Sequence, residues 1–390
     1  MASGLKPIHR VVTGNDARGK SKVAWDGPAP NAHEASMGAG RGHTDFWVWN
    51  DTPAPLSGEH DDGNLPYTFA GPRNGGHLRV VQSRSRPADY DPAKDPDAIA
   101  PHPPEFRAGS NGIWDRGGNN MFSSAMHKTE TIDYGIMLTG ERILTLDDCE
   151  LVMKPGDIVC QIGAWHQWSS PKDGAQMAFD MFAARFVDGA AGLAQGNDKP
   201  IRPDQKLKLP EGVKPARRIV TIDREPGKGS LVSDGPTPDV RFDPARPGFA
   251  SARLWVTDSN PAKIVYESLH LPHTIEPPRN GSVCRVVTFP PDDNWKGKVG
   301  AKEVQAYFQA MGSPGASTYS PQAPHPYMQK TRTLEFGLVL DGEIVLVLDT
   351  QEVSVKAGDI VVQRGTNHAW SNRSTKPAVV AIASHDGANR

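Results

Sequence analysis

The chain contains an internal repeat, and this repeat restricts its fold more than any other feature. The segment HRVVTGNDARGKSKVAWDGPAPN, which begins at His9, aligns without a gap with RRIVTIDREPGKGSLVSDGPTPD, which begins at Arg217. Further along, HKTETIDYGIMLTGE (127–141) aligns with QKTRTLEFGLVLDGE (329–343). The same shift then aligns KPGDIVCQIGAWHQWS with KAGDIVVQRGTNHAWS. The two halves are therefore copies of one domain.

The length of the chain agrees with this division. A chain of 390 residues is too long for one ordinary core and suits two domains. We expect an N-terminal domain over residues 1–195 that holds the candidate metal and active site. A Pro- and Lys-rich linker should follow over 196–215, and a C-terminal domain with a degenerate site over 216–390.

The second part of each copy has the pattern of β-structure. IVLVLDTQEVSVKAGDIVVQR (344–364) contains two apolar strands around a hairpin, then a Gly-Asp turn and a third strand. Many short strands separated by turns predict a sandwich or a small barrel. Both faces of residues 344–348 are apolar, so we expect the neighbouring copy or another subunit to cover the second face. One clear helix is predicted over 301–311, packed across the barrel wall and ended by Gly312.

Charge and composition indicate the class of partner. The net charge is −2 with acidic and basic residues interspersed, which argues against nucleic acid. The longest apolar runs have the length of strands, so neither secretory targeting nor membrane spanning is expected. Three sparse cysteines match neither a zinc knuckle nor a disulfide framework, and a reducing cytoplasm suits them. We expect a cytoplasmic protein that takes a small-molecule substrate, and a homo-oligomer is left open.

Two short motifs in each copy resemble those of the cupin superfamily. Copy one carries Asp133, Gly140, PGD at 155–157, Gly163 and His166, and copy two carries Glu335, Gly342, AGD at 357–359, Gly365, His368 and Asn372. Because both copies match in register, the chain resembles a bicupin. The resemblance implies an all-β fold of two tandem cupin barrels of the double-stranded β-helix (jelly-roll) type, with few helices. It also implies metal and substrate in the barrel mouth, but it does not fix the reaction.

Copy one offers a set of metal ligands. Alternate residues of a strand share a face, so His127, Thr129 and Asp133 point the same way. Thr129 stands where the family has a second histidine, which leaves His127, Asp133 and His166. Two imidazoles and one carboxylate can hold Fe(II) and leave positions open for substrate and oxygen, and Mn or Zn could also occupy the site. The alternative is a metal-free polar pocket.

The equivalent set in copy two is weaker. Gln329 replaces the first histidine, and Glu335 and His368 provide only one carboxylate and one imidazole. This is a poor transition-metal site. We expect copy two to serve structure or ligand binding.

Tryptophans lie close to both motif histidines. Packing in the barrel is expected for Trp370, whereas Trp168 either packs or stacks on a flat substrate. The predicted catalytic and metal-binding residues are His127, Asp133 and His166, and the predicted substrate-binding residues are Thr129, Trp165, Trp168, Gln329, Glu335 and His368.

Three classes of function follow. The first is a bicupin enzyme with one metal-dependent site in the N-terminal copy, which cleaves a small oxygenated, aromatic or enolic molecule oxidatively as a dioxygenase. The second is an isomerase or lyase in which His166 or Asp133 moves a proton next to a carbonyl. The third is a bicupin that binds or stores a small molecule without catalysis.

Overall fold

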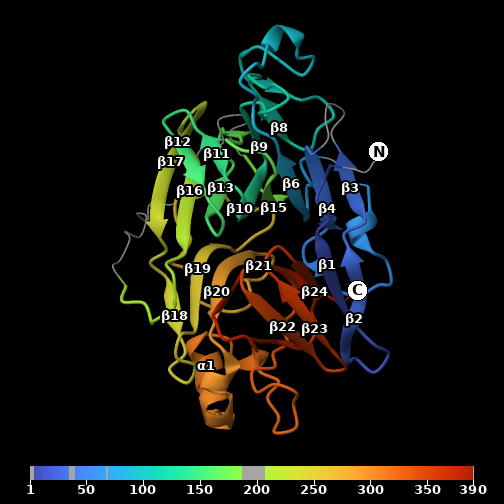
Figure 1. Cartoon of the computed structure of the whole chain (residues 1–390), viewed down its shortest axis with the longest axis vertical. Helices are drawn as coiled ribbons and strands as arrows, with labels where there is room; N and C mark the ends of the chain where they lie inside the picture. The colour runs from blue at the N-terminus through green and yellow to red at the C-terminus, as the bar shows by residue number, and fades with distance from the viewer. Residues whose placement is uncertain (1–3, 35–39, 67–68, 187–206, 390) are drawn as a thin grey trace.

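The computed structural model describes residues 4–34, 40–66, 69–186 and 207–389 (Figure 1). Its strands form two large sheets and three three-stranded sheets, and the one α-helix in the described ranges is α1 (Ala301–Ala310). The predicted all-β fold with few helices is thereby confirmed. Residues 196–206 of the predicted linker lie outside the described residues.

An eight-stranded sheet forms most of the N-terminal body. Its strands are, in spatial order, β17 (Lys228–Pro236), β16 (Arg217–Glu225), β13 (Ile158–Ile162), β10 (Thr131–Thr139), β15 (Ala175–Ala183), β6 (Gly76–Ser83), β4 (Gly42–Trp49) and β3 (Asn31–Glu34). A small sheet of β12 (Glu150–Met153), β11 (Arg142–Thr145) and β14 (Gln167–Ser169) packs against it. Between them lies a core that includes Leu144, Met177 and Phe179. A second small sheet contains β7 (Glu105–Phe106), β8 (Ile113–Asp115) and β9 (His127–Thr129).

A nine-stranded sheet forms the C-terminal body. Its strands are, in spatial order, β18 (Val240–Phe242), β19 (Ala250–Thr257), β20 (Ser282–Phe289), β26 (Ala378–Ala388), β21 (Thr333–Asp341), β24 (Ile360–Arg364), β1 (His9–Asn15) and β2 (Ser21–Pro28), with β5 (Ala54–Pro55) beside β26. The sheet of β23 (Glu352–Lys356), β22 (Glu343–Leu348) and β25 (His368–Ser371) packs on it around Leu346, Val355 and Val361. Short 3₁₀ turns are η1 (Asp62–Asn64), η2 (Pro92–Lys94), η4 (Asp292–Asn294), η5 (Lys296–Lys298) and η6 (Pro314–Ala316). Each body is thus a set of packed sheets and not a closed barrel.

The two copies exchange their first two strands. β1 pairs in parallel with β24, with Val12 opposite Val362, and β16 pairs in parallel with β13, with Ile162 opposite Ile222. Figure 1 shows β1 and β2 beside the C-terminal strands, and β16 and β17 beside the N-terminal strands. The predicted domain boundaries mark the two copies of the repeat in the sequence. That each copy folds as an independent unit stays a prediction.

Helix α1 agrees with its sequence pattern. Val304, Tyr307 and Phe308 are buried on one face and pack into the C-terminal core. Gly312 follows with φ of +70°, a left-handed conformation that glycine adopts without strain.

The cover of β22 differs from our expectation. Val347, on the second face of this strand, packs with Met328 and Ala369 of the same copy. The prediction that the other copy covers this face is therefore wrong, because the segment before β21 folds back over its own small sheet. Cover by another subunit stays a prediction.

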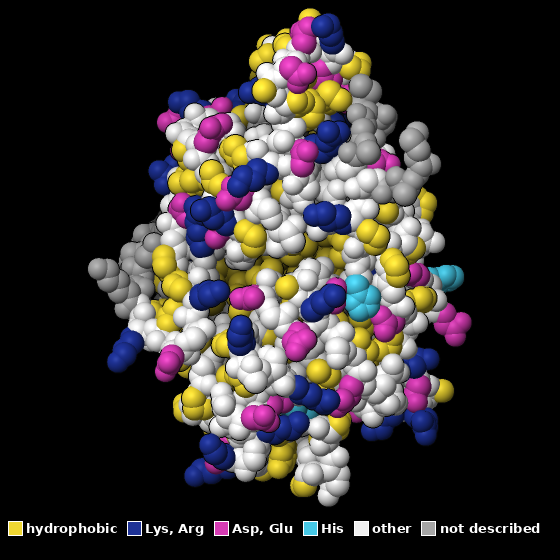
Figure 2. All heavy atoms as spheres, in the orientation of Figure 1, with side chains coloured by type: hydrophobic (Ala, Val, Ile, Leu, Met, Phe, Trp, Pro, Cys, Tyr) yellow, Lys and Arg dark blue, Asp and Glu magenta, His cyan; other side chains and the backbone are white. Residues whose placement is uncertain are grey.

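The described surface shows no dominant charge. Figure 2 shows Lys and Arg intermixed with Asp and Glu over the face in view. None of the described helices combines the length and the apolar character that a membrane crossing requires.

Candidate functional site

The N-terminal body contains a cavity of about 130 Å³ between its large and small sheets. Its walls include all three predicted catalytic residues. Side chains from β6, β9, β10, β11 and β14 meet there. The polar and aromatic lining residues are His127, Asp133, His166, Ser124, Arg79, Arg142, Trp168, Phe69 and Phe179.

The two histidines of this cavity are direct neighbours. His127 and His166 exchange backbone hydrogen bonds of 2.9 Å, and their ring centroids are 4.3 Å apart. The Nδ1 of each lies 2.8 Å from the carbonyl oxygen two residues earlier, at Ala125 and Ala164. Nδ1 therefore carries the proton, and Nε2 keeps a lone pair for a hydrogen bond or a metal.

Burial favours the neutral form of both rings. Burial lowers the pKa of His127. Burial lowers the pKa of His166 well below its ordinary value, and the neighbouring His127 adds to that effect. A neutral imidazole can accept a proton or bind a metal, so the pair is in a form suited to either role.

Asp133 is buried and unusually basic. Burial raises its pKa to about 7, the charge of Asp180 adds to the rise, and a hydrogen bond from Thr131 opposes it. The Thr131 hydroxyl donates to Asp133 Oδ1 at 2.5 Å and also lies 2.5 Å from the Thr129 hydroxyl. Asp133 can therefore take up or release a proton near neutral pH. Thr129 contacts Thr131 and is not part of the cavity wall, and its predicted contact with substrate stays a prediction.

The two tryptophans near His166 have different environments. Trp168 lines the cavity, and its ring centroid lies 5.5 Å from that of Phe179 and 6.2 Å from that of His166. Trp165 is fully buried beneath the guanidinium of Arg116, which is 4.4 Å from the ring centroid. Trp165 does not line this cavity, and its predicted role in substrate binding stays a prediction.

Arg142 is a site residue that our sequence reasoning missed. Its side chain lines the cavity at the start of β11, yet the residue is only 5% exposed. Its Nε and Nη1 have no hydrogen-bond partner among the described residues. The centre of the guanidinium lies 5.0 Å from the ring centroid of Trp168 and 5.6 Å from that of Phe179. Burial lowers the pKa of Arg142 to about 9, which still leaves it cationic at neutral pH.

A signal for Arg142 was present in the repeat. Its equivalent in copy two is Ile344, because Arg142 pairs with Met153 and Ile344 pairs with Val355 in the same register. An arginine at a core position that is apolar in the other copy indicates a function other than packing.

The three predicted metal ligands line one cavity but do not form a compact donor set. Among the described residues, the only group of three or more His, Cys, Asp or Glu side chains with ligand atoms within 4.8 Å of one another is His33, His43 and Asp45. The hydrogen bonds at Nδ1 leave Nε2 of His127 and of His166 available as ligand atoms. The carboxylate of Asp133 is directed to Thr131, so the predicted three-ligand site is not assembled in this structure.

The equivalent residues of copy two bind one another. Gln329 Nε2 donates to His368 Nε2 at 3.2 Å, because the Nδ1 of His368 bonds to a carbonyl. Glu335 accepts hydrogen bonds from Ser384 and Gln363. These polar groups are satisfied without a ligand, as we expect for a degenerate site.

The space near the copy-two residues is small. Gln329 lines a cavity of about 30 Å³ that Tyr307 of α1, Tyr327 and Arg246 also line. The guanidinium of Arg246 lies 3.6 Å from the ring centroid of Tyr327 and 4.4 Å from that of Tyr307. Glu335 and His368 do not line this cavity, and their predicted contacts with substrate stay a prediction.

Comparison with protein families identifies one domain. Residues 315–384, in the second copy, match the family model described as Cupin domain.

Curated relatives match over short segments. Phomopsin biosynthesis cluster protein C' of Diaporthe leptostromiformis is 58% identical over 48 residues, which are 12% of this chain and 25% of that protein. The cupin-domain-containing oxidoreductase virC of Hypocrea virens is 31% identical over 101 residues, which are 25% of this chain and 36% of that protein. The chain thus spans about a quarter to about a third of the length of these relatives.

Solved structures show a distant likeness. Quercetin 2,3-dioxygenase from Acinetobacter baumannii has 11% sequence identity and a TM-score of 0.30, with 80% of this chain and 74% of that chain covered. A likeness of this size bears on neither the site nor the reaction.

Proposed function

We propose that this chain, which belongs to the cupin superfamily, is an enzyme with its active site in the cavity of the N-terminal copy. Its substrate is a small oxygenated anion, and the reaction is proton transfer next to a carbonyl, as in an isomerase or lyase. The single observation that carries the proposal is the buried guanidinium of Arg142, which lines the same cavity as Asp133.

Arg142 supports an anionic substrate. A buried charge without a partner destabilises a folded protein by several kcal/mol, at order of magnitude. A carboxylate or enolate oxygen would accept hydrogen bonds from Nε and Nη1 and offset this cost. The faces of Trp168 and Phe179 beside the guanidinium suit a planar group, which agrees with an enolic or aromatic substrate.

Asp133 supports proton transfer. With a pKa raised to about 7, its ionised form can remove a proton from the carbon next to a carbonyl, and the electrons of that C–H bond form the enolate. Arg142 would stabilise the negative oxygen of that enolate. The protonated Asp133 then returns the proton to a neighbouring carbon in an isomerisation, or to a leaving group in an elimination. The neutral His127 and His166 can accept hydrogen bonds from substrate hydroxyls at Nε2.

Metal-dependent oxidation is the second candidate. Two adjacent imidazoles with available Nε2 atoms favour it, as does the word oxidoreductase in the name of the virC relative. His127 and His166 would hold Fe(II), Mn or Zn, and such an ion would polarise a bound oxygen atom. This candidate requires the carboxylate of Asp133 to turn away from Thr131.

The test combines binding and exchange. A panel of small 2- and 3-oxo acids is titrated into the protein by calorimetry, and exchange of the α-protons in D₂O is followed by NMR. Arg142→Met should weaken binding by about 100-fold or more, since it removes a charged hydrogen-bonding group. Asp133→Asn should retain binding but lose exchange, and the wild-type rate should rise with pH through about 7.

Other outcomes separate the alternatives. Oxygen consumption that depends on added Fe(II) and on His127 and His166 would favour the second candidate. Binding without any turnover would indicate a small-molecule-binding protein. Equal affinities of the wild type and Arg142→Met for every acid would contradict an anion site at Arg142.

A further inference from the structure

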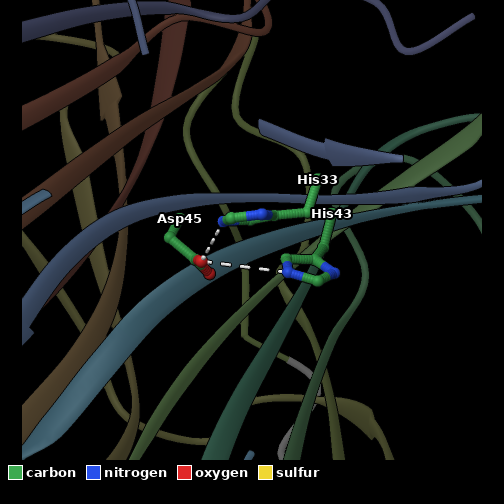
Figure 3. Close-up of side chains that lie close together, drawn as sticks. All are labelled: His33, His43 and Asp45. Carbon is green, nitrogen blue, oxygen red and sulfur yellow. Dashed lines mark ion pairs between the residues drawn. The ribbon is translucent and has the colours of Figure 1, made fainter. Parts of the chain in front are cut away.

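We propose that His33, His43 and Asp45 form a site for one divalent transition-metal ion such as Zn²⁺, separate from the cavity histidines. These three residues lie on β3 and β4, at the edge of the eight-stranded sheet. Figure 3 shows the two imidazoles and the carboxylate turned toward one another.

Strand register explains the convergence. His33 and His43 are directly opposite in the antiparallel pair of β3 and β4, and their ring centroids are 4.9 Å apart. Asp45 follows His43 by two residues, so its side chain points to the same face of the strand. The backbone thus places three ligand side chains on one side of the sheet.

The spacing of the ligand atoms suits an ion better than hydrogen bonds. Asp45 Oδ2 lies 3.5 Å from His33 Nε2 and 3.9 Å from His43 Nε2, beyond ordinary hydrogen-bond lengths. This oxygen is buried and has no hydrogen-bond partner among the described residues. Bonds of about 2.0–2.1 Å in a tetrahedral zinc site place two donor atoms about 3.3–3.4 Å apart. A small closing movement would therefore let one ion bind all three.

Neighbouring groups prepare the ligands. Arg79 Nε donates to Asp45 Oδ1 at 2.8 Å and so directs Oδ2 toward the histidines. Burial, with the nearby Arg79, lowers the pKa of His43 to about 3, so its imidazole is neutral. Half of the His33 side chain is exposed, which gives an ion access from solvent and leaves room for a water ligand.

The second copy shows that the fold does not require this cluster. The shift that aligns the two copies here places His33, His43 and Asp45 at Arg241, Ser251 and Arg253. The strand register agrees, because Arg241 lies opposite Ser251 in β18 and β19. The three ligands therefore occur in one copy only. Residues that the shared fold requires would be present in both copies. The occurrence of the three ligands in one copy therefore indicates a local site.

The site also adjoins the cavity. Arg79 holds Asp45 through Nε, and its side chain is part of the cavity wall. Arg79 thus lies between the cluster of His33, His43 and Asp45 and the cavity of the N-terminal copy. The two sites share no ligand residue, so each can be tested independently.

The experiment measures metal in the full chain. Protein freed of metal with a chelator is dialysed against Zn²⁺ and analysed for bound zinc, and Co²⁺ is used to record visible absorption bands of tetrahedral coordination. We expect about one ion per chain. His33→Gln, His43→Gln and Asp45→Asn should each weaken binding by about tenfold or more.

Two controls make the result specific. His102→Gln removes another histidine that is paired with a carboxylate, at 3.1 Å from Asp115, and should leave bound zinc unchanged. The double variant His127→Ala/His166→Ala should also keep its zinc. Asp45→Asn retains an oxygen that can accept from Arg79, and circular dichroism checks that each variant is folded.

Three results would overturn the proposal. They are no zinc bound to the wild type, a zinc content that is unchanged in both His33→Gln and His43→Gln, and complete loss of zinc from the His127→Ala/His166→Ala variant. None of these results depends on whether the chain is an enzyme.

Discussion

The ammonium group of Lys128 lies 2.7 Å from the carboxylate of Asp223, and neither side chain is exposed to solvent. Lys128 belongs to β9, the strand that also carries His127, whereas Asp223 belongs to β16, which the C-terminal copy contributes. The other oxygen of Asp223 accepts the backbone N–H of Trp165 at 2.9 Å. This buried pair joins the exchanged strand to the wall of the candidate site.

Breaking the pair should destabilise the protein strongly. Lys128→Met leaves the Asp223 charge buried without its partner, so we expect a loss of about 3–5 kcal/mol in the free energy of unfolding. The double variant Lys128→Met/Asp223→Asn should lose less free energy of unfolding than the single variants Lys128→Met and Asp223→Asn lose together. Urea unfolding measures this free energy for all three variants. Lys214→Met, at an exposed pair with Asp341, is the control and should cost about 1 kcal/mol or less. Losses of similar size at both pairs would contradict the argument.

The strand exchange predicts that the halves depend on each other. Residues 1–195 alone would lack β16 and β17 and would expose the edge of β13. An unpaired apolar strand edge promotes aggregation. We therefore expect this half to be aggregated or unfolded by itself, and to form a stable complex when it is produced together with residues 196–390. Size-exclusion chromatography and circular dichroism provide the measurement. A monomeric N-terminal half with cooperative unfolding would argue against a structural need for the exchange.

Arg142 should reduce stability in the absence of a ligand. Arg142→Ile places the residue of the equivalent copy-two position at this site and removes a buried cation. Replacement of a buried charge by an apolar side chain is often neutral or stabilising by about 1–4 kcal/mol. Thermal unfolding should therefore show an equal or higher midpoint for the variant. A clear fall in the midpoint would mean that the guanidinium stabilises the fold, and would weaken its assignment to ligand binding.

The carboxyl group of Asp133 should make stability depend on pH. Its pKa is raised from 3.8 to about 7 in the folded chain. Between about pH 4 and about pH 7 the folded state therefore holds a proton that the unfolded state has released, so this group's contribution to stability falls as pH rises and is constant above that range. Asp133→Asn should remove this slope. Urea unfolding at several pH values compares the two proteins, and parallel stability curves would contradict a raised pKa.

Local patterns predicted the parts of the fold that depend on neighbours in the sequence. The spacing of Val304, Tyr307 and Phe308 predicted α1, because one helical face must be apolar to pack on the core. The alternation along 127–133 predicted one shared face for His127, Thr129 and Asp133, and the structure places His127 and Asp133, but not Thr129, in the wall of one cavity. Strand periodicity predicts which side chains share a face, because successive side chains point to opposite faces of the sheet.

Other features depended on contacts that no local pattern encodes. The repeat indicates two copies, but it does not say that β16 pairs with β13, since the parallel partner lies far away in sequence. The rings of Trp165 and Trp168 looked equivalent in the sequence, yet one packs under Arg116 and the other lines the cavity. Asp133 was a ligand by its motif, but its carboxylate is directed to Thr131.

The sequence by itself determined the duplication, the β-rich architecture and the histidines of the N-terminal copy, because these are written in residue identity and in short periodic patterns. Only the tertiary structure decided which charges share a site. Arg142 and Asp133 line one cavity from two different sheets, and His33 lies opposite His43 through the register of β3 and β4. These arrangements depend on sheet packing and on pairing between separate strands. The interaction energies between such residues exist only in the folded chain.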